Sequence, residues 1–467
     1  MAGGLGLAGC VTFAADNGIG TVAGIARQDL KKNVVFIRNE SEAAQVQGRV
    51  SKLLKKPLTA DAAVQIALLN NRGLQAAYNE LAIAEAKRVE SSLPPNPRFS
   101  ITRIASAPET EIETQIVADI LAMATLPVRT GIATDQFRQA QLRAAEETLR
   151  VAAEARRAYY RAVAAGALVR VLTEAKAAAE STARVAKQLG ETGALNKLDQ
   201  AREQVLYAET TAQLATARQN EAAERESLVR VLGVWGKDLK FKLPSALPAL
   251  PRRPRKLPGI EAEAVRKRLD LQVARLELAA LAKSYGLTQA TRFISLLEAG
   301  PVFKTTKDRE RGETVRDAGF DIEFEIPIFD FGEARLRQAE QTYMQAANRL
   351  LQLAVNVRSE ARSAYRTYRS AYDIAEHYQR EVLPLRKIIN EQSQLQYGAM
   401  QTDVFALVVG ARERNAANRA AIEAELAFWL ADLHLRATIS GGATATEAGG
   451  ATEFSPAAQT AAAGANE

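Results

Sequence analysis

The stretch EIPIFDFGEARLRQAEQ, residues 325–341, changes its character at its centre. Up to Phe329, apolar and acidic residues alternate with a period of two, which is typical of a β-strand. From Glu333 to Leu383 the chain contains neither glycine nor proline. We therefore expect a strand that passes almost directly into a helix of about 50 residues, which would be about 75 Å long.

The expected long helix carries a seam of small and apolar residues at steps of three or four. Its members are Leu336, Ala339, Tyr343, Ala347, Leu350, Ala354, Val357, Ala361, Ala364, Tyr368, Ala371, Ala375, Tyr378 and Val382. A period close to 3.5 residues indicates coiled-coil packing. A second, weaker stripe favours neighbours on both sides, as in a curved wall; it consists of Leu351, Val355, Tyr365 and Tyr372. A self-contained helical bundle also explains the seams, but not the strands at one end.

Two pairs of β-strands are expected. The first pair covers 99–104 and 112–122, and the second covers 293–303 and 319–329 with a charged turn at 304–316. The last strand places its phenylalanines and isoleucines on one face and its carboxylates on the other. Such strands fit either a soluble hairpin with one wet face or a membrane barrel with a polar lumen. The strands alone leave both interpretations open.

The chain repeats itself at an offset of about 200 residues. Residues 267–274 match the helix that opens at 58–63 and continues to 77. We predict that strand changes to helix twice, at positions marked by Pro127 and Gly131, and by Pro327, Asp330 and Gly332. We predict tight turns between long helices at Gly193 and Gly398. Each half then reads helix, hairpin, long helix, turn, long helix.

The repeat divides the chain into segments. The expected segments are a partial signal with a lipobox at 1–10, an N-terminal extension at 11–56, repeats at 57–236 and 260–437, a linker at 237–259 and a disordered tail at 438–467. The linker is rich in proline and basic residues, so it should be extended. No aromatic residue is interleaved in its basic cluster, so a solvated tether is favoured over a nucleic-acid site.

Composition excludes several classes of protein. Charged residues make up 25%, the mean hydropathy is −0.16, and no apolar run approaches the ~18 residues of a membrane-spanning helix. The net charge of +7 is mild and its charges are interspersed, so we expect no nucleic-acid partner. His377 and His434 are the only histidines and stand apart. We therefore expect no enzyme, no cofactor and no metal site.

The single cysteine suggests a lipid anchor. Leu7-Ala8-Gly9-Cys10 resembles a bacterial lipobox, in which the cysteine is lipidated after cleavage. Val11 rather than aspartate follows it, which would direct the protein to an outer membrane. The alternative is a chance tetrapeptide near the start of the sequence.

These features together resemble the TolC-type outer membrane efflux proteins. The resemblance rests on Pro327–Gly332, on 268–272, on the helix opening at 58–63, on Leu93-Pro94-Pro95-Asn96-Pro97 and on the segment from Tyr397 to Phe405. It implies a mainly α-helical fold with a small antiparallel β part. Three copies would join four strands each into a twelve-stranded barrel above a helical tunnel, which closes the strand edges that lipid forbids.

The resemblance also implies a function. The chain would be a passive exit duct in the outer membrane, with its helices in the periplasm, docked through a periplasmic adaptor to an inner-membrane pump. Asp403 matches an acidic residue of the pore aperture in this family, and Lys197 could latch to it, although Asp403 could also be a helix N-cap. The rival hypothesis is a periplasmic coiled-coil adaptor or scaffold. An adaptor should contain one helical hairpin rather than two.

Overall fold

The structure is a computed structural model that describes residues 13–441, apart from residues 108, 400 and 403. It is mainly helical with one four-stranded sheet, and it divides into two compact units. The first unit combines the chain up to Arg38 with Arg72–Glu147 and Arg268–Arg358. The second combines Asn39–Asn71, Thr148–Lys267 and the chain from Ser359 onward. Each unit therefore takes segments from both halves of the sequence.

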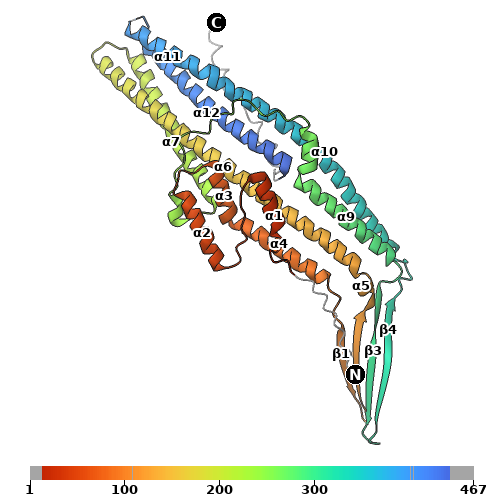
Figure 1. Cartoon of the computed structure of the whole chain (residues 1–467). Helices are drawn as coiled ribbons and strands as arrows, with labels where there is room; N and C mark the ends of the chain where they lie inside the picture. Colours follow the sequence, from red (N-terminus) through yellow and green to blue (C-terminus); the bar gives the residue numbers. More distant parts are fainter. Residues whose placement is uncertain (1–12, 108, 400, 403, 442–467) are drawn as a thin grey trace. The chain divides into compact units, whose positions relative to one another are not determined.

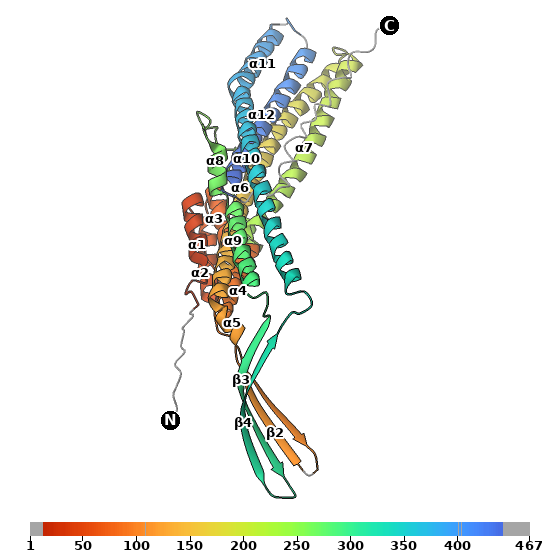
Figure 2. The same cartoon turned by 90° about the vertical axis from the view of Figure 1, so that its right-hand side faces the viewer.

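The sheet belongs to the first unit and is antiparallel throughout, in the order β1-β2-β3-β4 (Figure 1). Its strands are β1 (Arg98–Ala105), β2 (Glu109–Asp119), β3 (Leu296–Asp308) and β4 (Thr314–Glu325). The two predicted hairpins thus pair with each other through β2 and β3, as Figure 2 shows from the side. β1 and β4 remain as edge strands.

The predicted strand limits were wrong at several places, and three of them have a clear physical reason. The charged turn expected at 304–316 shrinks to residues 309–313, because Lys304 pairs with Asp317 and extends the ladder. β2 stops at Asp119 rather than at 122, since the Asp119 carboxylate accepts the Ala122 N–H (2.7 Å) and caps a short helix, α5 (Ile120–Ala124). β4 stops at Glu325, shortly before Pro327, which cannot donate to a ladder.

The helices of the first unit pack through buried polar contacts as well as apolar ones. They are α1 (Ile19–Ile25), η1 (Ala26–Leu30), α4 (Arg72–Ser91), α5, α9 (Leu269–Ala290) and the first parts of α6 (Leu126–Glu191) and α10 (Glu333–His377). Glu85 of α4 is 1% exposed and accepts the Ala14 N–H at 2.5 Å. Lys283 of α9 reaches the buried Asp135 of α6 at 2.5 Å. The first bond joins α4 to the segment that precedes α1, and the second joins α9 to α6.

The second unit contains two antiparallel helical pairs (Figure 1). One consists of the remainder of α6 and α7 (Lys197–Leu232), and the other of α11 (Leu383–Gly398) and α12 (Val404–Ser440). The unit also contains α2 (Glu40–Leu54), α3 (Ala60–Asn70), η2 (Gly236–Leu239), α8 (Ile260–Lys267) and the end of α10. Tilted and edge-to-face ring contacts hold its centre together, and they join Tyr160, Trp429, Phe428, Tyr368 and Tyr372.

The predicted long helix exists, and it continues beyond Leu383 as α10, η3 (Tyr378–Val382) and α11. The five residues of η3 are a π-helical turn directly before Pro384, where a proline would clash with a regular α-helix. The predicted seam is confirmed, because its most deeply buried members are Val357, Ala361, Ala364, Tyr368 and Ala375. Among the described helices, none combines the length and apolarity needed to cross a bilayer.

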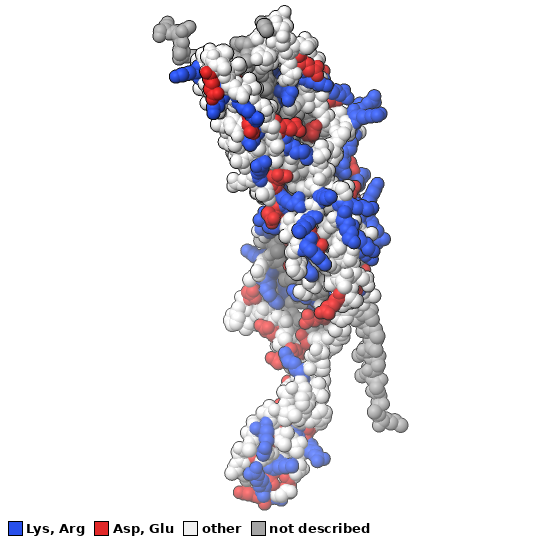
Figure 3. Space-filling view, turned by 90° about the vertical axis from the view of Figure 1, so that its left-hand side faces the viewer, with Lys and Arg blue, Asp and Glu red and all other residues white. Residues whose placement is uncertain are grey.

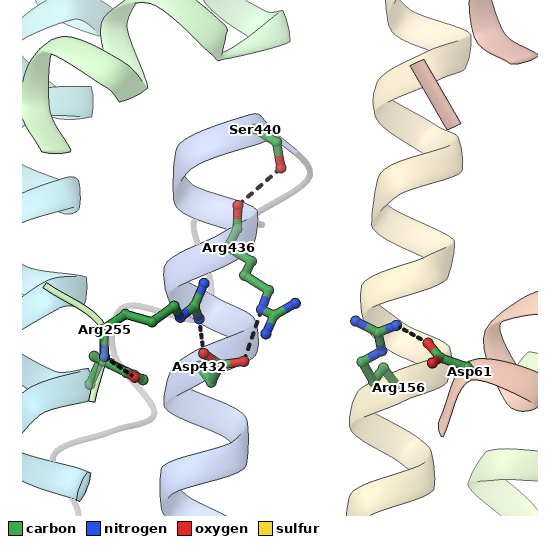
Figure 4. Close-up of polar contacts among 7 residues, drawn as sticks. Asp61, Arg156, Arg255, Asp432, Arg436 and Ser440 are labelled. Carbon is green, nitrogen blue, oxygen red and sulfur yellow. Dashed lines mark hydrogen bonds and ion pairs between the residues drawn. The ribbon is translucent and has the colours of Figure 1, made fainter. Parts of the chain in front are cut away.

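The linker is bound to the second unit rather than being a solvated tether. The Arg255 guanidinium pairs with Asp432 of α12, which also accepts from Arg436 at 2.9 Å (Figure 4). The Trp429 indole donates to the Pro248 carbonyl oxygen at 3.0 Å. The proline-rich backbone of the linker leaves carbonyl groups unpaired, so side chains of the helices can bind them.

A separate ion pair within the second unit joins Arg156 of α6 to Asp61 of α3 at 2.6 Å (Figure 4).

Candidate functional site

The sheet has two chemically different faces. Residues paired across an antiparallel ladder lie on the same face, and the pairs Phe99–Ile116, Thr114–Phe303 and Pro301–Phe320 connect the apolar side chains of all four strands. These side chains are not covered by the residues that the structure describes: their exposed fractions run from 40% for Ile116 to 67% for Phe320. The apolar face consists of Phe99, Ile101, Ile116, Phe303, Phe320, Ile322 and Phe324.

The opposite face is polar and mostly acidic. Its carboxylates are Glu109, Glu111, Glu113, Asp119, Glu298, Asp308, Asp317, Asp321, Glu323 and Glu325. Lys304 pairs with Glu111 at 2.6 Å, and Arg98 pairs with Glu298. Gln115 donates to Asp321 at 2.7 Å, across two strands that are not neighbours in the sheet. A sheet with one uncovered apolar face and one hydrated acidic face suits a boundary between lipid and water.

The second strand-to-helix junction is a tight, hydrogen-bonded turn of the backbone. The Phe331 N–H donates to the Pro327 carbonyl oxygen at 2.8 Å, and the Asp330 carboxylate accepts the Gly332 N–H at 2.9 Å. Phe331 and Gly332 both adopt positive φ angles, 47° and 71°. A Cβ atom at Gly332 would lie 2.3 Å from the Arg292 carbonyl oxygen. Only glycine therefore fits at this position without displacing the backbone.

Arg292 holds the same junction from the side of α9. Its Nε donates to the Phe331 carbonyl oxygen at 3.0 Å, and its guanidinium pairs with Glu333 at 3.1 Å. The Arg292 carbonyl oxygen in turn accepts from Arg335 at 3.3 Å. Sequence reasoning missed Arg292, because no pattern around it distinguishes it from other arginines at helix ends.

The first junction is built differently. The strand ends at Asp119 and α5 follows, so the change from strand to helix precedes Pro127 and Gly131. Pro127 is the second residue of α6, where its missing N–H costs nothing. Gly131 lies inside α6, and the Lys283 ammonium donates to its carbonyl oxygen at 3.4 Å.

The helical pairs end in two turns. Gly193 has a φ of 75° between α6 and α7, and the Asn196 side chain caps α7 by accepting the Asp199 N–H at 2.8 Å. Lys197 is exposed and forms no ion pair within the described residues. Gly398 is the last residue of α11. Asp403, Cys10 and the tail from residue 442 lie outside the described residues, so a Lys197–Asp403 latch stays a prediction.

A cavity of about 400 Å³ lies in the second unit near these turns. Side chains of α6, α7, α11 and α12 line it, among them Ala179, Leu206 and Val408, which pack on one another. Glu203 lies one helical turn before Leu206, is 4% exposed, and has no hydrogen-bond partner for Oε2. Burial raises the pKa of Glu203 above its ordinary value. No group of three or more potential metal ligands occurs in the described part of the chain.

Comparison with known proteins places the fold. No family model and no curated protein matches the sequence. Among solved structures, CusC matches with a TM-score of 0.69 and 19% identity over 82% of this chain and 92% of its own. The outer-membrane channel OprN matches with 0.69 and 19% over 84% and 92%, and the CmeC outer membrane channel of Campylobacter jejuni with 0.66 and 15% over 82% and 86%. The predicted resemblance is thus confirmed for the fold: this chain has the fold of the outer-membrane channels.

Proposed function

We propose that this chain is an outer-membrane exit duct of a tripartite efflux or secretion system. The observation that carries the proposal is the uncovered apolar face of a sheet whose other face is acidic, on a chain with a channel fold. Exposure of so many large apolar side chains to water would be energetically unfavourable for a soluble monomer. Lipid contact on one face and a water-filled lumen on the other satisfy both faces.

The proposed assembly is a homotrimer. One chain supplies four strands, whereas single-chain membrane barrels contain about eight or more, and lipid does not tolerate open strand edges. Three copies would give a twelve-stranded barrel. The second stripe on α10 supports contact between chains, because Leu351 and Val355 are 66% and 67% exposed within one chain.

The proposed duct performs no chemistry. It would conduct small molecules or ions that an inner-membrane pump expels, and a periplasmic adaptor would connect the two. Its helices would stand in the periplasm, and lipidated Cys10 would add an anchor in outer membrane lipid. Asp403 is the proposed aperture residue. Neither a nucleic acid nor a cofactor has a part in this function.

The rival function, a periplasmic adaptor or scaffold, is disfavoured by the sheet. A soluble adaptor would bury the apolar face containing Phe320 and Ile322, and here no part of the described chain covers them. The two helical pairs of the second unit also exceed the single hairpin that an adaptor needs.

The test uses two neighbouring residues of β4 that point to opposite faces. We expect the unaltered chain in detergent extracts of the outer membrane as a trimer that conducts ions in a planar bilayer. Ile322→Lys places a charge on the lipid face at a cost of about 2–4 kcal/mol near the bilayer centre, so assembled protein should be lost. Glu323→Lys is the matched control on the lumen face; it should assemble and change the ion selectivity. Recovery of the unaltered chain as a soluble periplasmic monomer would refute the proposal.

A further inference from the structure

A basic strip lies on the second unit, on segments other than those of the helical turns. Two contacts align its two segments: the Gln47 side chain donates to Asp238 at 2.7 Å, and the Leu58 N–H donates to the Lys242 carbonyl oxygen at 2.8 Å. Residues 237–242 therefore run beside α2 and the loop that follows it. We define the α2 strip by its cations: Arg49, Lys52, Lys55, Lys56, Lys237, Lys240 and Lys242.

The orientation of α2 exposes these cations. Its apolar side faces the protein, since Val46, Val50 and Leu54 are 4%, 0% and 9% exposed. The cations of α2 lie on the other side of the helix, and all seven residues of the strip are exposed. Figure 3, which looks at the molecule from the side of α2 in Figure 1, shows Lys and Arg side chains gathered near the middle of this face.

The charge of the strip is not neutralised by the chain. None of the seven cations forms an ion pair within the described residues, whereas Lys267 and Arg202 elsewhere in this unit pair with Glu263 and Asp199. Glu40 and Glu42 lie in the first turn of α2, at the end away from the cations, and Asp238 is the only carboxylate within 43–58 and 237–242, where it accepts from Gln47. Like charges held side by side repel one another, so an anionic partner would stabilise this arrangement.

An exposed aromatic residue stands at the start of the same strip. Trp235 is 81% exposed and precedes η2, and Leu239 within η2 is 38% exposed. The other tryptophan, Trp429, packs on neighbouring rings and donates to a backbone carbonyl. Exposed tryptophans beside charged groups are typical hot spots of protein interfaces, where the ring fills a pocket and the charges select the partner.

We infer that the α2 strip, with Trp235 and Leu239, is a docking site for an acidic protein segment that carries an apolar anchor. A lipid surface fits less well, because α2 has already buried the apolar side with which an interfacial helix would insert. Phosphate groups fit less well too, because six of the seven cations are lysines, which lack the bidentate fork of arginine. The inference does not depend on the proposed duct function.

The test measures binding of acidic peptides to the full chain in detergent. Trp429→Phe leaves Trp235 as the only tryptophan, so its emission reports on the strip. The probe is a synthetic glutamate-rich peptide with a central leucine, and its lysine-rich counterpart is the negative control. We expect a blue shift of Trp235 emission with the acidic peptide, and an affinity that falls about tenfold when salt shortens the Debye length from ~10 Å to ~3 Å.

Matched charge reversals locate the site. The variant Lys52→Glu, Lys55→Glu, Lys240→Glu should abolish binding. Trp235→Ala removes the emission signal, so its affinity is measured by the anisotropy of a fluorophore-labelled peptide, and it should fall about 30-fold or more, the loss that defines a hot spot. The control reverses three exposed cations of the linker, a segment that contains no exposed tryptophan: Arg252→Glu, Arg253→Glu and Lys256→Glu. It should bind like the parent, and circular dichroism should show all variants folded.

Three outcomes would overturn the inference. If the strip variant and the linker variant lose the same affinity for the acidic peptide, binding depends on net charge rather than on the α2 strip. A Trp235 shift with phosphatidylglycerol vesicles or purified cell-wall glycan, but not with the acidic peptide, would assign the strip to a different anionic surface. Disassembly of the oligomer in the strip variant would assign it to contact with a second copy of this chain.

Discussion

The glycine at the second strand-to-helix junction offers a graded test of the structure. Gly332→Ala adds a Cβ atom that would lie 2.3 Å from the Arg292 carbonyl oxygen, at a backbone φ of 71°. The left-handed conformation costs an alanine about 1–2 kcal/mol. Moving the Arg292 backbone away weakens its bonds to Phe331 and Arg335, at about 1 kcal/mol each. We expect a total loss of about 3–4 kcal/mol.

Two other glycines of the same unit separate these contributions. Gly312 has a φ of 67° and nothing within 4 Å of its added Cβ, so Gly312→Ala should cost only the left-handed conformation, about 1–2 kcal/mol. Gly319, in β4, has neither a positive φ nor a neighbour within 4 Å. Gly319→Ala should therefore be neutral or slightly stabilising.

The assay is thermal unfolding of the purified protein in detergent, followed by circular dichroism. For a chain of 467 residues, the unfolding entropy is about 1 kcal/mol per kelvin, so each kcal/mol shifts the Tm by about 1 °C. The expected shifts of the Tm are about −3 to −4 °C for Gly332→Ala, about −1 to −2 °C for Gly312→Ala and none for Gly319→Ala. Equal shifts at Gly332 and Gly312 would refute the close approach of Arg292 to the junction.

The remaining predictions concern the second unit. Asp432→Ala leaves the half-exposed Arg255 without its ion partner and should lower the free energy of unfolding by about 1–3 kcal/mol. Chemical denaturation measures this loss. The control is Arg436→Ala, which removes only the more exposed of the two cations that pair with Asp432. Burial raises the pKa of Glu203, so the folded state favours its neutral form, and stability should fall as the pH rises through that pKa. Glu203→Gln should therefore raise the Tm at neutral pH and reduce the dependence of the Tm on pH. Burial also raises the pKa of Tyr159 to about 12, so stability should decline between about pH 10 and pH 12, and a Tyr159→Phe variant that declines equally over this range would contradict the assignment.

Periodicity predicted the elements of this fold well. Alternation around Phe320 and Ile322 identified β4, and the seam from Leu336 onward identified α10, because each pattern extends over many residues. The uncovered face of the sheet was also visible as a pattern. What periodicity could not tell is which solvent that face meets, and the exposure of Phe320 at 67% within the folded chain bears on that question.

Predictions from local sequence patterns were wrong or missing where a residue distant in the sequence determines the structure. Lys304 and Asp317 read as a turn, yet each becomes a strand residue because it faces the other across the ladder. The helix was expected to continue past Pro384 to the turn at Gly398, but the π-helical turn η3 that precedes Pro384 was not predicted. Arg292 is about 40 residues from the junction that it holds, so no local signal exists. These are tertiary effects, which single-sequence patterns do not contain.

The direction of the strands constrains how copies of this chain can assemble. In a four-stranded antiparallel sheet, the edge strands β1 and β4 run in opposite directions. β4 of one copy can therefore add to β1 of the next without breaking the antiparallel order. That contact joins two different surfaces, and repeated heterologous contacts give a ring when the rotation closes. A dimer whose two-fold axis crosses the sheet would pair one edge strand with itself and leave the other edge open, so only a closed ring of β4-to-β1 contacts removes every open edge.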